Sequence, residues 1–295
     1  MVAYKISLTK LEDLVTAVSK DWLKRAKKRT QEVNAAGEFD DGASIWGDIK
    51  IVFINLQHRK CAYCERKLAG RIKGKVEYDV EHYRPKGRVQ PWPGPSDHLN
   101  YEFPTGDPNE KGYYWLAYNL ENYAVACKSC NSGLKSDRFP IADNRGNTGM
   151  SVHDLDQLER PLLIFPVGDR ADDPSKLIGF NGITPVPAGN NTQDHTYHRA
   201  RVTIDFFRLA SVHDREELYW ERSVAISQLW ALIELENTSS DPQKKALASK
   251  AIKRLLTPSA PHSACVNAFA QLWKDDTGRA LEVAEEAIDY VALHD

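Results

Sequence analysis

The chain has 295 residues, of which 42% are hydrophobic and 27% charged, as expected for a globular protein with a sizeable core. No apolar run approaches the roughly 20 residues of a membrane span, and the first residues lack the apolar segment of a signal peptide. Four of the five cysteines fall into two CxxC pairs, a pattern that favours metal binding in a reducing compartment over a disulfide framework. We therefore expect a cytoplasmic protein that does not enter membranes.

The formal net charge of −2 is unevenly distributed along the chain. Residues 59–139 carry 14 Lys+Arg against 10 Asp+Glu, an excess of +4, whereas residues 140–295 carry 16 against 23, an excess of −7. The segment that holds the paired cysteines is thus the basic one. A basic segment suits a phosphate-bearing ligand, and an acidic one would repel it.

The N-terminal half predicts two helices followed by a strand. Apolar residues at helical spacing indicate one helix over 8–33 and a second over 45–57. Alternation over 76–82 predicts a strand with Asp79 and Glu81 on one face. The proline-rich stretch 90–112 favours irregular structure, residues 113–118 are a short aromatic strand candidate, and a short helix is expected near Asn131.

The C-terminal half changes character after Pro140. Residues 162–165 and 177–180 are typical of short strands, separated by an Asp-rich turn. From about Thr192 the pattern is helical, over roughly 194–209, 212–236, 242–255, 262–274 and 277–292.

The two CxxC pairs are the strongest motif in the chain. Cys61 and Cys64 form the first pair, and Cys127 and Cys130 form the second. Two intervening residues let a tight turn aim both sulfurs at one ion, so the pairs can close a tetrahedral four-thiolate zinc site. Disulfide pairing is the alternative. Cys265 is expected to be a small buried hydrophobe.

The pairs bracket residues suited to phosphodiester chemistry. His82 has an ordinary pKa near 6.5 and can accept a proton at cellular pH. Glu81 and Asn131 offer hard oxygens for Mg²⁺ or Mn²⁺, and Asp79 is an additional candidate ligand. Basic side chains that can contact backbone phosphates follow in the same region: Arg84, Lys86, Arg88, Lys128, Lys135 and Arg138.

The segment from Cys61 to Pro140 resembles an HNH, or His-Me finger, nuclease of the zinc-bound type. The letters of that pattern fall on His82, Asn122 and Asn131, an H-N-N variant. Within that family, the sequence more closely resembles the HNH proteins that accompany ABC-type ATPases in Septu-like and some retron anti-phage systems. The stretches that carry this closer likeness are Cys61-Ala62-Tyr63-Cys64-Glu65, Glu81-His82-Tyr83-Arg84-Pro85-Lys86, Tyr114-Trp115-Leu116-Ala117-Tyr118 and Arg138-Phe139-Pro140-Ile141-Ala142-Asp143.

The resemblance implies a role for each of these residues. His82 would be the general base, Glu81 and Asn131 would hold Mg²⁺ or Mn²⁺, and Asn122 would orient His82 or pin the intervening loop. Many HNH proteins have Asp before the histidine and His at the last position, and these departures favour an oxygen-liganded ion over zinc at the catalytic site. A purely structural His82 and the choice of Asn119 instead of Asn122 are the alternatives.

Two further features have alternative interpretations. His195 and His198 lie three residues apart on an expected helix, where they form either a metal pair or, more simply, a solvated face. Large apolar groups such as Phe206, Trp220 and Trp230 exceed what a small metal module needs, which suggests a protein-docking surface in the acidic helical region.

We therefore predict an α+β protein with a ββα-metal HNH module and a four-cysteine zinc knuckle, flanked by helices. The expected units are N-terminal helices over 1–58, the nuclease module with its zinc site over 59–140, a linking region over 141–191 and a helical region over 192–295. The predicted function is metal-dependent cleavage of DNA, with RNA as an alternative substrate, in an anti-phage complex with an ABC-type ATPase. The alternative is a zinc-stabilised nucleic-acid-binding or adaptor protein without catalysis.

Overall fold

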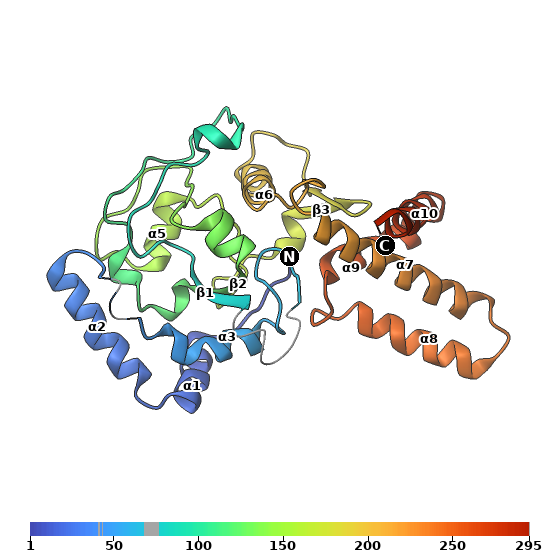
Figure 1. Cartoon of the computed structure of the whole chain (residues 1–295), viewed down its shortest axis with the longest axis horizontal. Helices are drawn as coiled ribbons and strands as arrows, with labels where there is room; N and C mark the ends of the chain where they lie inside the picture. The colour runs from blue at the N-terminus through green and yellow to red at the C-terminus, as the bar shows by residue number, and fades with distance from the viewer. Residues whose placement is uncertain (41, 43, 68–76, 295) are drawn as a thin grey trace.

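The computed structural model describes residues 1–40, 42, 44–67 and 77–294 as a helix-rich protein with two small antiparallel sheets. This agrees with the predicted mixture of helices and strands. The helices are α1 (Leu8–Val18), α2 (Trp22–Ala36), α3 (Lys50–Leu56), α5 (Val152–Glu159), α6 (His195–Phe206), α7 (Glu216–Thr238), α8 (Pro242–Leu255), α9 (Ser263–Asp275) and α10 (Thr277–His294). The strands are β1 (Tyr78–His82), β2 (Tyr123–Cys127), β3 (Ile178–Asn181) and β4 (Thr184–Pro187). Figure 1 shows α7 to α10 gathered on the side of the molecule away from α1 and α2.

The expected first helix is two helices, α1 and α2. Ser7 caps α1 by accepting a hydrogen bond from the Lys10 amide, and the helix ends at Ser19, which is extended (φ −143°, ψ 97°). The break turns the chain so that Trp22 is fully buried and its indole N–H donates to the Ile45 carbonyl at 2.8 Å. The second expected helix is found as the short 3₁₀ turn η2 (Trp46–Ile49) followed by α3.

The first sheet pairs β1 with β2, so that Tyr78 lies opposite Cys127 and His82 opposite Tyr123. The predicted strand is confirmed over 78–82, while Val76 lies outside the described residues. After β2 the chain forms the short π-helix η6 (Ser129–Lys135), the helix expected near Asn131. A strand pair followed by a helical turn thus places both CxxC pairs and His82 within one small unit.

Two strand predictions were wrong because the backbone amides there do not pair with a neighbouring strand. At 113–118 the Tyr113 amide donates to the Pro85 carbonyl at 2.8 Å and the Leu116 amide to the Tyr113 carbonyl at 2.9 Å. The aromatic run at 113–118 contains the 3₁₀ turn η4 (Tyr114–Leu116), in which the Trp115 indole donates to the Met150 carbonyl at 2.9 Å. Residues 162–165 are buried, but the Ile164 amide donates to Thr203 Oγ1 and the Phe165 amide to Asp172 Oδ2. The strand expected at 177–180 is found as β3, paired with β4.

The C-terminal helices agree with the predicted ranges, whereas α5 was not predicted. Its start has a clear local signal, since Ser151 accepts a hydrogen bond from the Asp154 amide.

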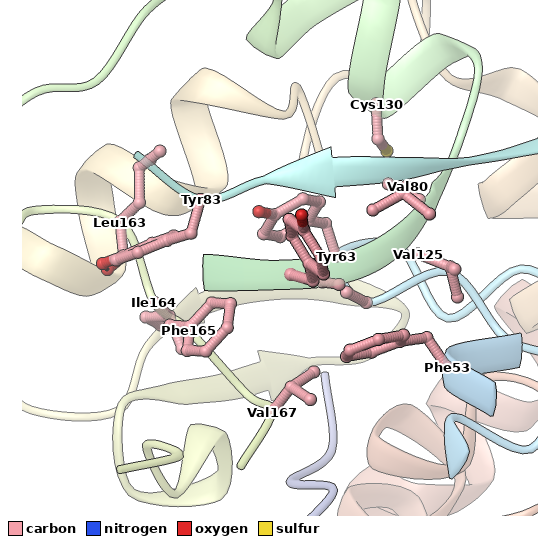
Figure 2. Close-up of a cluster of buried hydrophobic side chains, with 14 of the residues drawn as sticks. Phe53, Tyr63, Val80, Tyr83, Val125, Cys130, Leu163, Ile164, Phe165 and Val167 are labelled. Carbon is pink, nitrogen blue, oxygen red and sulfur yellow. Dashed lines mark hydrogen bonds between the residues drawn. The ribbon is translucent and has the colours of Figure 1, made fainter. Parts of the chain in front are cut away.

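The hydrophobic core divides the chain inside α7. One cluster of buried residues extends from Met1 to Leu218, and a second extends from Ala225 to Ala287. Figure 2 shows the first cluster, in which Phe53, Val80, Val125 and Phe165 meet from four separate segments. The first core crosses the expected boundaries near residues 58, 140 and 191. No described helix is long and apolar enough to cross a membrane.

Candidate metal centre and polar cavity

The fold brings the four paired cysteines together. Cys61 and Cys64 lie in the turn after α3, and the Ala62 amide donates to the Val125 carbonyl at 3.0 Å, which fastens this turn to β2. Cys127 ends β2 and Cys130 lies in η6. All four sulfurs are buried and lie within 4.8 Å of one another.

This cluster fits a zinc ion. A tetrahedral zinc site with Zn–S bonds of about 2.3 Å has sulfurs about 3.8 Å apart, and Cys64 Sγ lies 3.8 Å from Cys127 Sγ. All five cysteines are free thiols, so the disulfide alternative does not apply. Hydrogen bonding from the Cys127 thiol, with contributions from Cys130 and Cys61, holds the pKa of Cys64 well below that of an ordinary thiol. We conclude that the cluster can hold zinc as a structural ion.

A polar cavity of about 540 Å³ lies beside this centre. It brings together three of the predicted catalytic residues, Glu81, His82 and Asn131, with two basic side chains, Lys86 and Arg88. The remaining wall is formed by Trp46, Val80, Pro85, Gly87, Ser136 and Asp137. The cavity therefore joins the end of β1, the loop that follows it, and η6.

His82 is held in a defined tautomer at this cavity. Its Nε2 lies 3.0 Å from the Ala117 carbonyl oxygen. Because a carbonyl can only accept, Nε2 carries the proton and Nδ1 keeps its lone pair. Within the described part of the chain, Nδ1 has no hydrogen-bond partner.

Aromatic rings fix the plane of the His82 imidazole. Trp46 packs against it edge-on with ring centroids 4.7 Å apart, and Tyr123 does so at 5.0 Å. Burial, together with the positive charge of Lys86, lowers the pKa of His82 to about 3. The imidazole is therefore neutral at physiological pH and can accept a proton.

Glu81 is buried and faces a lysine. Lys135 Nζ lies 2.8 Å from Glu81 Oε1, and the same ammonium donates to the His82 carbonyl oxygen at 3.0 Å. The contact with Oε1 is ionic but lacks hydrogen-bond geometry, so this oxygen has no aligned donor. Burial raises the pKa of Glu81, and Lys135 opposes the shift.

Asn122 and Asn119 have different roles. Asn122 is fully buried and does not line the cavity. Its Oδ1 accepts from the Arg84 amide at 2.8 Å, and its Nδ2 donates to the Arg84 carbonyl at 2.9 Å. These bonds clamp the chain two residues after His82. Asn119 accepts a hydrogen bond from the Glu121 amide and caps the short 3₁₀ turn η5 (Leu120–Asn122).

The structure does not agree with phosphate contacts for Arg84 and Lys135. Arg84 is fully buried, where it pairs with Glu159 at 2.8 Å and Asp156 at 3.0 Å. Lys135 is fully buried against Glu81. Because both cations are neutralised by carboxylates inside the protein, neither is presented to a nucleic acid backbone.

The other predicted basic residues are closer to the surface. Arg88 pairs with Asp137 at the cavity rim, and Lys86 Nζ lies 4.5 Å from the Phe39 ring centroid and also lines the cavity. Lys128 is exposed. Arg138 lines a separate cavity, to which Leu134 of η6 also contributes.

Three further candidates lie outside the His82 cavity. Asp79 pairs with Lys50 at 3.3 Å and does not line the cavity, although it shares a β1 face with Glu81. The ring of His198 stacks on Phe103 with centroids 3.8 Å apart, while His195 lines a different cavity near Arg199.

Sequence reasoning missed Trp46 and the role of Lys135. Trp46 belongs to an apolar stripe at helical spacing, which indicated core packing. Lys135 lies in a basic run, which indicated a surface. The signal available for Lys135 was its place four residues after Asn131, on the same turn of helix.

The fold and the site define a helix-rich mixed protein with a buried four-thiol centre beside a polar cavity. The chain is 28% identical over 170 residues to the Septu protein PtuB of Bacillus mycoides (strain KBAB4), covering 55% of this chain. It spans about half the length of that curated relative, since 50% of the relative is covered. This similarity supports the resemblance to Septu-related proteins. No family model matches the chain, and no solved structure matches it.

Proposed function

We propose that this protein is a metal-dependent endonuclease of the HNH type that acts in anti-phage defence. The observation that carries the proposal is the cavity in which His82, with Nε2 held by a backbone carbonyl, lies beside the oxygens of Glu81 and Asn131. Phosphodiester hydrolysis by in-line attack needs a base for the water and a cation for the leaving oxygen. This cavity offers groups for both.

His82 is suited to take the proton from an attacking water. Its Nδ1 keeps a lone pair, and the Trp46 and Tyr123 rings hold the imidazole in place. The low pKa of about 3 ensures the neutral form, although it also makes His82 a weak base. An anionic substrate would favour the protonated form, and would thereby strengthen the base.

Glu81 and Asn131 are the residues that would hold Mg²⁺ or Mn²⁺. Both line the cavity, and Glu81 Oε1 is a buried oxygen without an aligned donor. A bound divalent ion would stabilise the negative charge that develops on the leaving oxygen. Lys135 fixes Glu81 in position and places an ammonium group beside it.

The substrate class follows from the charge around the cavity. Lys86 and Arg88 line it, and the exposed Lys128 immediately precedes η6. These groups suit the backbone phosphates of DNA, with RNA as the alternative substrate. The relative is named a Septu protein, and we infer from this that the chain acts with a protein partner, an ABC-type ATPase.

One observation favours a second candidate function. Lys135 already neutralises Glu81, so a lysine, and not a metal ion, balances the carboxylate. This arrangement is also expected of a zinc-stabilised nucleic-acid-binding or adaptor protein without catalysis.

Cleavage of supercoiled plasmid in Mg²⁺ or Mn²⁺, with the ATPase partner included, separates the two functions. We expect nicking or linearisation by the native chain and a loss of about 10²-fold or more in His82→Ala. His58→Ala is the control, because His58 lies outside the cavity. Native-level nicking by a folded His82→Ala variant would exclude His82 as the base. No cleavage of DNA or RNA by the native protein would favour the adaptor function.

A further inference from the structure

Arg215 reaches the metal centre from a distant part of the chain. It immediately precedes α7, and 85 positions separate it from Cys130. Its side chain is buried, and Nη1 lies 3.7 Å from Cys130 Sγ while also donating to the Phe207 carbonyl at 2.9 Å. Nε donates to Glu217 at 3.0 Å. The guanidinium is therefore held by three contacts, one of which is to a cysteine sulfur.

The net charge of a loaded centre favours a cation at this position. Four thiolates and one Zn²⁺ sum to −4 + 2 = −2, and the four cysteines are buried. Uncompensated charge in a low-dielectric interior is costly, whereas a hydrogen-bonded guanidinium offsets that cost. Among the described residues, Arg215 is the cationic side chain that contacts a cysteine sulfur directly.

We propose that Arg215 belongs to the metal centre, where it is the counter-cation that holds the zinc-bearing thiolates. The two CxxC pairs then bind the ion, and the arginine that precedes α7 stabilises their thiolates. The proposal rests on zinc occupancy and is independent of the nuclease activity.

Neighbouring contacts fasten the same two regions together. Glu65, next to Cys64, accepts from Ser263 Oγ at 3.0 Å and pairs with Lys60 at 2.8 Å. Lys60 in turn donates to the Ala260 carbonyl at 3.0 Å, and Arg66 pairs with Glu221 of α7 at 3.1 Å. The first CxxC turn is thus anchored to α7 and to the start of α9. Arg215 is the link in this interface that contacts the sulfurs.

The chain offers a matched control seven residues further on, in α7. Arg222 is as buried as Arg215, at 3% exposure each. It donates to the Ile183 and Leu209 carbonyls and contacts no cysteine of the cluster. Replacing either arginine by methionine removes one buried guanidinium, but only Arg215→Met removes the charge from the thiolates.

The test measures how fast zinc leaves the folded protein. Zinc-loaded native protein, Arg215→Met and Arg222→Met are mixed with excess 4-(2-pyridylazo)resorcinol, while circular dichroism follows the fold. We expect release at least about tenfold faster from Arg215→Met than from Arg222→Met, the typical effect of removing a group that supports metal ligands. Equal release rates would overturn the proposal.

If the methionine variants do not fold, the same comparison is made with Arg215→Lys and Arg222→Lys. Lysine keeps the charge but loses the planar fork that reaches Cys130. We then expect release to be several-fold faster from Arg215→Lys than from Arg222→Lys. Equal rates in this pair would likewise overturn the proposal.

Discussion

Lys135 and Glu81 form a buried ion pair, with Nζ 2.8 Å from Oε1, at 0% and 2% side-chain exposure. The same ammonium donates to the carbonyl oxygen of His82. One lysine from η6 thus fixes both a side chain and the backbone of the adjacent residue at the end of β1. The two halves of the cavity are locked together by this contact before any ligand binds.

Lys135→Met should destabilise the protein by about 3–5 kcal/mol, because it leaves the Glu81 charge buried without a partner. The double variant Lys135→Met with Glu81→Gln should recover part of that loss, since the uncompensated charge is removed. Urea unfolding of the single and double variants gives the coupling between the two sites. Lys128→Met, on the exposed side of the same segment, should stay within about 0.5 kcal/mol of the native protein. An unchanged midpoint for Lys135→Met would contradict the structural role of the pair.

Zinc binding should contribute to the free energy of folding. The cluster joins segments that are more than 60 residues apart, Cys64 and Cys127 being separated by 63 positions, so metal binding and folding are linked. We expect one zinc per chain by elemental analysis, and insoluble or unfolded protein from Cys127→Ser. Cys265→Ala is the matched control, because Cys265 is a buried cysteine outside the cluster. A folded, zinc-free sample of the native chain would refute the prediction.

Asn122→Ala should loosen the loop after His82. The change leaves the amide and the carbonyl of Arg84 without partners inside the protein, at about 1–3 kcal/mol for each buried group. Asn119→Ala removes only a cap on η5 and should cost about 1 kcal/mol. Chemical denaturation compares the two variants directly. Equal losses of stability in the two variants would mean that the Asn122 hydrogen bonds stabilise the protein no more than the Asn119 cap does.

An exchangeable ion at Glu81 and Asn131 should behave differently from zinc. Two oxygen ligands with water make an open, weak site, unlike a closed thiolate site. Brief EDTA treatment should therefore abolish plasmid cleavage without a change in circular dichroism, and Mg²⁺ or Mn²⁺ should restore cleavage. Asn131→Ala should raise the concentration of ion needed for half-maximal rate. Full activity in EDTA would show that no such ion takes part.

In this chain, sequence patterns predict local structure better than they predict buried ion pairs between distant residues. The CxxC spacing is enough to predict the four-thiol cluster, and helical periodicity is enough to predict α6 to α10, because both depend on neighbouring residues. Arg84 and Lys135 were assigned to the surface by charge alone. Inside the protein, Arg84 pairs with Glu159, 75 positions away, and Lys135 pairs with Glu81, 54 positions away. No local sequence pattern encodes such a pairing. The strand predicted at 113–118 is absent for a related reason, since the Tyr113 amide donates to the carbonyl of Pro85, 28 positions away, and the Leu116 amide donates within its own turn.

The docking surface expected in the helical region also needs a revised boundary. Deleting the whole helical region 192–295 would remove part of the first core, because that core continues into α6 and the start of α7. Phe207 stacks on Tyr63 with ring centroids 4.0 Å apart, and Tyr63 lies between Cys61 and Cys64. We therefore expect this truncation to unfold the zinc centre itself.

Single substitutions on the far helices test docking without that damage. Leu247 on α8 and Leu293 on α10 are 67% and 80% exposed, so glutamate at either position should leave the fold and the zinc content unchanged. If the acidic helical region contacts the proposed ATPase partner, Leu247→Glu and Leu293→Glu together should lower co-purification several-fold. Leu158→Glu is the control, since Leu158 is a 42% exposed leucine on α5. Full recovery of the partner with the double variant would place the docking surface elsewhere, with the N-terminal helices α1 and α2 as the next candidates.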